Sequence, residues 1–309
     1  MNKVTSTMAL ALLVVGPWLF AYASGHGDFA RYAMLGTMLA LQLCLLARPV
    51  ARFALLLPLV YGAAAVTAGA TDGVAALLVA VAAGVGASSS RGLHMGLLSA
   101  LAATVIGSFE PAEPAVVLKR SADMLVGCAY GFVLAMTLLR GLRVTSRAVH
   151  PQTALSYAVL SSVLVLVAWL TARAAGFPHG WWLPLAVAAV GEPSLEGTSL
   201  RAVSRLAVAL AGVCALVILA VWLDHDLLRL ALLFAVLLVA PATMGRGAPL
   251  QSLLLTPILV LVVGPAGTPT GPEGYLGTTL FACLLVFGMT ILGKWMLWTL
   301  RPDSGHAPA

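Results

Sequence analysis

Residues 154–175 read ALSYAVLSSVLVLVAWLTARAA, an apolar run whose single charged residue, Arg173, lies near its end. A helix of about 20 apolar residues is long enough to cross the hydrocarbon core of a bilayer. The apolar character is continuous and does not alternate between neighbouring residues, so it favours a helix over a strand of a membrane barrel. This stretch therefore predicts a transmembrane helix.

Eleven further runs of the same kind lie on either side of it. They cover residues 7–23, 31–47, 53–70, 73–88, 93–109, 122–140, 180–193, 203–222, 227–243, 249–265 and 279–300. The runs at 73–88 and 180–193 are the shortest and adjoin Gly, Pro or Ser, which is typical of broken or half-length helices. The sequence predicts an all-α integral membrane protein with about 12 transmembrane helices.

The composition supports this fold class. The 309 residues are 61% hydrophobic and only 9% charged, with a mean hydropathy of +1.01. A water-soluble domain carries roughly 25% charged residues, so this chain cannot cover a soluble surface. The four cysteines, at positions 44, 128, 214 and 283, all lie in apolar runs without metal-ligand spacing. They are interpreted as small buried apolar side chains.

The placement of the basic residues predicts the orientation in the membrane. With the N-terminus, the even-numbered loops and the C-terminus on one side, 12 of the 17 Lys and Arg residues lie on that side, and five lie on the other: Arg31, Lys119, Arg120, Arg173 and Arg229. The basic side faces the cytoplasm, so both termini are expected inside. The basic balance is thereby explained without nucleic acid, which is not expected as a partner.

The chain also repeats itself at an offset of 153 residues. His26-Gly27 aligns with His179-Gly180, and the arginine pair Arg48 and Arg52 aligns with Arg201 and Arg205. We therefore expect two parallel six-helix repeats, residues 1–145 and 146–309, related by an axis along the membrane normal. Residues 1–24 also resemble a secretory leader, but the first run has a repeat partner and is better interpreted as a structural helix.

Aromatic and charged residues gather between 176 and 212. His179, Trp181 and Trp182 lie at the predicted outer end of the eighth span, where they form either an interfacial aromatic belt or a stacking surface for a planar ligand. Glu192, Glu196, Arg201 and Arg205 lie at the predicted inner end. They either anchor the helices or form an inner gate that attracts anions, with a carboxylate able to exchange protons.

Two polar residues elsewhere are candidates for a role inside the membrane. Asp123 is the deepest of the charged residues at the outer helix starts and is a candidate proton carrier. Gln42 lies well inside a span and can hydrogen-bond across helices or to a ligand. No nucleotide-binding loop or hydrolase motif is present. We expect no enzyme activity, cofactor or metal.

The stretch 176–212 resembles the fusaric acid resistance-like membrane domain, the family that includes aromatic acid exporters. The matching positions are Gly176, Pro178, His179, Gly180, Trp181, Trp182, Pro193, Gly197, Thr198, Arg201 and Arg205. The chain departs from the family pattern at Val208 and Ala209, where Gly-Thr is usual. Between its two predicted halves it has only a short basic loop, residues 140–153, where larger relatives carry a cytoplasmic domain. The resemblance covers the second half well and the first half weakly.

The resemblance implies a secondary, proton-driven exporter of aromatic or other weak organic acids in the bacterial cytoplasmic membrane. In this hypothesis Arg48, Arg52, Arg201 and Arg205 attract the anion, while His179, Trp181 and Trp182 contact it near the exit. Glu192, Glu196 or Asp123 carries the proton. Candidate partners are a periplasmic adaptor protein and a second copy of the chain. The alternative is a non-transporting membrane scaffold or a subunit of an envelope-associated complex.

Overall fold

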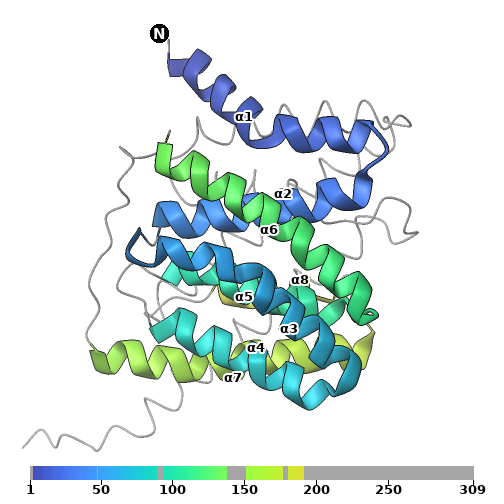
Figure 1. The fold of residues 1–309 in the computed structure, drawn as a ribbon. Helices are drawn as coiled ribbons and strands as arrows, with labels where there is room; N and C mark the ends of the chain where they lie inside the picture. Colours follow the sequence, from blue (N-terminus) through green and yellow to red (C-terminus); the bar gives the residue numbers. More distant parts are fainter. Residues whose placement is uncertain (1–2, 47, 89–93, 138–150, 177–179, 191–309) are drawn as a thin grey trace, which may run out of the picture.

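A computed structural model describes residues 3–46, 48–88, 94–137, 151–176 and 180–190, and the structural statements below concern these residues. The described residues form helices, without a strand in these ranges (Figure 1). The elements in chain order are α1 (Lys3–Ala23), α2 (Gly27–Leu46), the 3₁₀ helix η1 (Arg48–Leu56), α3 (Leu57–Ala70), α4 (Asp72–Ser88), α5 (His94–Phe109), α6 (Pro114–Thr137), α7 (Pro151–Ala175) and α8 (Trp182–Val190). The prediction of an all-α chain is confirmed for these residues.

The first eight predicted spans each correspond to one observed helix. The main difference concerns α6, which begins at Pro114 although the apolar run begins at 122. Proline suits the first position of a helix, and the charged residues that follow it are compatible with a helix, so an apolar criterion starts this helix too late. Lys119 and Arg120 therefore lie on α6 and not before it, and Asp123 lies on α6 as predicted. The four predicted spans after residue 200, and the proposed repeat, lie outside the described residues.

Helices α2 and α6 form the most extensive contact in the described bundle. A Cβ atom placed on Gly36 or Gly127 would collide with the backbone of the opposite helix, and one on Gly131 would lie 2.7 Å from the Thr37 carbonyl oxygen. Thr37 Oγ1 donates a hydrogen bond to the Gly127 carbonyl at 3.0 Å. Small residues that allow two backbones to approach are characteristic of helix pairs in membranes.

The outer surface of the bundle is apolar. Two described helical stretches are long and apolar enough to cross a membrane by length and composition: Arg52–Ala70, which joins the end of η1 to α3, and Ala154–Ala175 in α7. Only 39% and 33% of their most apolar 18-residue windows are buried inside the protein. Leucine side chains such as Leu59 and Leu155 point outward with about two thirds of their surface exposed, at 67% and 66%. A helix that is apolar on its exposed face as well as its packed face suits a lipid environment.

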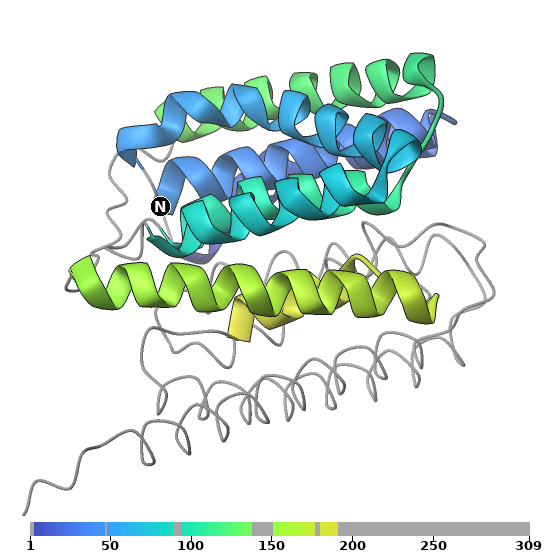
Figure 2. The same ribbon diagram turned by 90° about the horizontal axis from the view of Figure 1, so that it is seen from below.

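The described helices run roughly side by side, so alternate connections meet at the same end of the bundle (Figures 1 and 2). We call the end at which α1, α3, α5 and α7 finish the acidic end, because every Asp and Glu in the described ranges lies there: Asp28, Asp72, Glu110, Glu113 and Asp123. Helix α7 ends at this side on Gly176, whose φ of 59° is the left-handed conformation that closes helices. The arrangement agrees with the predicted grouping of these loops on one face of the membrane.

Several polar side chains inside the described bundle are hydrogen-bonded, whereas the Trp18 indole nitrogen is buried without a hydrogen-bond partner there. Gln42 on α2 accepts a hydrogen bond from the buried Ser99 hydroxyl on α5 at 3.2 Å. The prediction that Gln42 bonds across helices is therefore confirmed. Cys44 and Cys128 are buried, as expected, and the Cys128 thiol approaches the Gly36 carbonyl oxygen at 3.4 Å.

Candidate functional site

Five of the predicted site residues lie outside the described residues: His179, Glu192, Glu196, Arg201 and Arg205. Arg48 and Arg52 both lie on η1, at the end of the bundle opposite the acidic end. Arg52 is exposed, with its guanidinium carbon 5.4 Å from the centre of the Phe53 ring. The proposed attraction of an anion by these arginines stays a prediction.

Trp181 and Trp182 lie at the start of α8 and are packed into the protein. Their indole rings contact each other edge to face at 5.7 Å between centroids, and only 4% and 8% of the two residues is exposed. An aromatic belt needs rings at the membrane interface, and a stacking surface needs an open ring face. In this conformation neither ring offers such a face, so a direct contact with a ligand requires the surrounding helices to move.

Asp123 lies on α6 with 14% of its side chain exposed, and its Oδ2 atom lies 3.7 Å from the Lys119 ammonium nitrogen. This distance is too long for a hydrogen bond, and Oδ2 is buried without a hydrogen-bond partner in the described structure. The proposed role of Asp123 in carrying a proton stays a prediction.

The most densely connected polar group at the acidic end was not among the predicted site residues. The Glu110 carboxylate, in the connection after α5, accepts hydrogen bonds from the Arg31 guanidinium at 2.7 Å, the Tyr32 hydroxyl at 2.9 Å and the Tyr61 hydroxyl at 3.0 Å. These donors lie on α2 and α3. One carboxylate therefore joins three elements that are distant in sequence. We call Arg31, Tyr32, Tyr61, Glu110 and Arg120 the Glu110 cluster.

Arg120 on α6 completes this cluster. Its guanidinium carbon lies 5.2 Å from the centre of the Tyr32 ring, and that of Arg31 lies 5.4 Å from the same ring. Both distances are within the range of cation–π attraction. Arg120 forms no salt bridge with any acid in the described ranges, so the cluster holds two positive charges against the one negative charge of Glu110.

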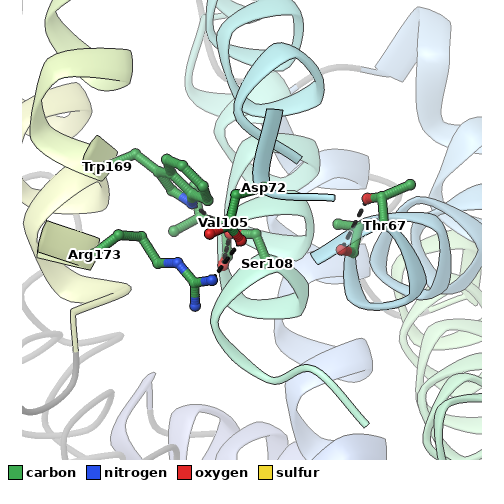
Figure 3. Close-up of polar contacts among 7 residues, drawn as sticks. Thr67, Asp72, Val105, Ser108, Trp169 and Arg173 are labelled. Atoms are coloured by element: carbon green, nitrogen blue, oxygen red, sulfur yellow. Dashed lines mark hydrogen bonds and ion pairs between the residues drawn. The ribbon is translucent and has the colours of Figure 1, made fainter. Parts of the chain in front are cut away.

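A second polar group lies where the end of α5 meets α7. Figure 3 shows its contacts from Trp169 to Ser108 and from Arg173 to Asp72. Phe109 contacts the Trp169 ring edge to face at 6.0 Å, and the Trp169 indole nitrogen donates a hydrogen bond to the Ser108 hydroxyl at 2.7 Å. Arg173 lies over the Phe109 and Trp169 rings at 5.9 and 5.6 Å and pairs with Asp72 at the start of α4. This group ties α7 to α4 and α5.

The Gly180-Trp181-Trp182 segment packs directly against this second group. A Cβ atom on Gly180 would lie 2.7 Å from the Phe109 ring and 3.4 Å from the Ala172 side chain. Glycine is needed here because the backbone passes close to the aromatic ring. Two neighbouring residues therefore make different contacts at this point. Phe109, the last residue of α5, packs against α7 and the segment before α8, and Glu110, the next residue, is hydrogen-bonded to α2 and α3.

Replacement of Asp72 by asparagine should have little effect on stability. Asp72 and Arg173 are 60% and 30% exposed, and exposed ion pairs contribute about 0–1 kcal/mol. We expect the free energy of unfolding in detergent micelles to fall by less than about 1 kcal/mol. A loss several times larger would show that this pair contributes more than an exposed ion pair does.

The comparisons with known proteins give one match. Residues 163–293 match the family model described as fusaric acid resistance protein-like. This match confirms the resemblance inferred from residues 176–212 and indicates a membrane protein, in agreement with the apolar helices. No curated protein and no solved structure matches the chain.

Proposed function

We propose, from the premise that residues 163–293 are fusaric acid resistance protein-like, that the protein is a secondary transporter of the bacterial cytoplasmic membrane. It exports aromatic or other weak organic acids as anions, with the proton gradient as the energy source. The family match is the observation that carries this proposal. The apolar helices are consistent with a chain that lies in the membrane.

The energetics favour outward movement of an anion. The cytoplasm is electrically negative, and moving one elementary charge across the membrane potential is worth about 2.3 kcal/mol per 100 mV. Arginines at the inner ends, Arg48, Arg52, Arg201 and Arg205, would collect the anion by raising its local concentration. Asp123, Glu192 or Glu196 would exchange the proton that couples export to the gradient.

The test is an efflux measurement in a strain that lacks the gene and in the same strain with the gene restored. Cells are loaded with labelled benzoate, and with labelled benzyl alcohol as an uncharged control of similar shape. We expect faster benzoate efflux in the restored strain, abolished by an uncoupler, and equal benzyl alcohol efflux in both strains. If no acid in a panel of aromatic and aliphatic acids leaves the two strains at different rates, the transport proposal is wrong and the scaffold alternative is preferred.

A further inference from the structure

We propose that the Glu110 cluster is a carboxylate-binding site at the acidic end of the bundle, in which the Glu110 side chain occupies the place of the transported acid. This inference rests on the proposed function for the identity of its ligand, a small monocarboxylate. It assigns binding to residues on α2, α3 and α6, which the sequence motif does not include.

The donors around Glu110 are those that a carboxylate needs. One oxygen accepts from the Arg31 guanidinium at 2.7 Å, and the other accepts from two tyrosine hydroxyls at 2.9 and 3.0 Å. Hydrogen bonds to an ionised acceptor are shorter and roughly twice as strong as neutral ones. Because the present occupant is itself a carboxylate, the geometry of the donors fits this chemical group.

The charge of the cluster favours an additional anion. The Arg31 and Glu110 side chains are only 24% and 14% exposed. The pair is therefore partly removed from water, and charges interact more strongly there than they do in bulk water. Arg120 adds a second positive charge beside Tyr32 and has no carboxylate partner in the described ranges. A substrate carboxylate can bind Arg120 first and then compete with Glu110 for the partly exposed Arg31 guanidinium. It reaches the hydroxyls of the buried Tyr32 and Tyr61 only when Glu110 moves away from them.

The aromatic rings of the cluster do not provide a surface for the rest of the ligand. Only 2% of Tyr32 and 0% of Tyr61 is exposed, and their rings are tilted against each other at 5.9 Å. The site therefore recognises the carboxylate group and not an aromatic ring. We expect benzoate and cyclohexanecarboxylate to bind with similar affinity, and benzamide, which has no charge, to bind far more weakly.

Competition with Glu110 predicts opposite effects for two substitutions. Glu110→Gln removes the internal competitor's charge while keeping its shape, so benzoate should bind about tenfold more tightly. Arg120→Gln removes a cation that contacts the ligand, so benzoate should bind about tenfold more weakly. Lys119→Gln is the matched control because it removes one positive charge from the neighbouring position, and its side chain is 67% exposed and points to Asp123.

The experiment measures benzoate affinity of the purified full chain in detergent micelles by titration calorimetry and by the ligand-induced rise in unfolding temperature. Unfolding temperatures without ligand show whether each variant is folded. Arg120 forms no salt bridge in the described ranges, so Arg120→Gln keeps the test valid even if Glu110→Gln fails to fold. Lys119→Gln is expected to leave the affinity unchanged.

Three results would overturn the site. Benzoate affinity could fall equally in Arg120→Gln and Lys119→Gln, which would indicate that nearby positive charges attract the anion without a specific site. It could fall or stay unchanged in a folded Glu110→Gln, which indicates that Glu110 only joins helices. Wild-type protein could also fail to bind benzoate.

The proposed function is tested separately from the site. If the wild type and Arg120→Gln export acid at equal rates, the site is rejected and the transporter is not. If the wild type binds benzoate but does not export it, the transporter is rejected and the site is not.

Discussion

Substitution of Gly127 by leucine is expected to prevent the folded protein from accumulating. Gly127 lies on α6 where the backbone of α2 passes, and even a single added Cβ would collide with the Ala33 carbonyl group. The obstacle is backbone, which cannot move aside as the end of a flexible side chain can. Overpacking of a core costs about 1–3 kcal/mol or more, and here it separates the largest helix contact of the described bundle.

The loss should extend beyond van der Waals contact. Separation of α2 from α6 breaks the hydrogen bond from Thr37 to the Gly127 carbonyl and moves Arg120 on α6 away from Tyr32 on α2. We therefore expect Gly127→Leu to cost at least about 3 kcal/mol, and Gly127→Ala to be harmful to a lesser degree. The measurement is the yield of monodisperse protein in detergent and its unfolding temperature.

Gly16→Leu on α1 is the matched control. A Cβ on Gly16 meets nothing within 4 Å, and leucine is a better helix former than glycine. Yield and unfolding temperature should stay at the wild-type level or rise. Equal damage from both substitutions would show that added bulk in any apolar helix disturbs insertion. Wild-type behaviour of Gly127→Leu would contradict the close approach of α2 and α6.

The helices of the described bundle could be predicted from the sequence because each apolar run is a local property of the chain. An apolar criterion starts α6 at residue 122 and not at Pro114, since Lys119 and Arg120 delay the apolar run without interrupting the helix. In a membrane protein, a helix and the apolar run within it need not begin or end at the same residue. A helix continues into the interface wherever its residues tolerate helical geometry.

The Glu110 cluster could not be predicted in the same way. Glu110 is separated from Arg31 by 79 residues and from Tyr61 by 49 residues, and no periodic pattern connects them. In the sequence, Glu110 is one of several acids at the predicted outer helix ends, and the two tyrosines read as ordinary residues of apolar runs. The one available signal was an acid directly after a span, and only packing of α2, α3 and α5 shows which donors surround it.

The glycine spacing on α6 is an intermediate case. Gly127 and Gly131 form a G-x-x-x-G pattern within an apolar run, which predicts a close helix contact. The pattern does not identify the partner helix, because several runs contain small residues at similar spacing. The prediction of a close contact was therefore available from the sequence, and the assignment of α2 required the structure.

Replacement of Trp169 by alanine should be the most damaging change in the second polar group. Trp169 is 1% exposed, its indole nitrogen bonds to Ser108, and its ring packs against Phe109 and lies under Arg173. Removal of a buried tryptophan side chain costs about 3–5 kcal/mol through lost contacts and the cavity that remains. We expect this loss in the free energy of unfolding in micelles, because α7 loses its main contact with the end of α5.

Two gentler variants separate packing from hydrogen bonding. Trp169→Phe keeps an aromatic ring but leaves the Ser108 hydroxyl without its donor, and Ser108→Ala removes the acceptor while the ring stays in place. A hydrogen bond contributes about 0.5–1.5 kcal/mol net. If it is the link between α5 and α7, the double variant should be less destabilised than the sum of the two single variants. If the single losses simply add, α7 is held by packing and by Arg173, and the Trp169 nitrogen makes no separate contribution.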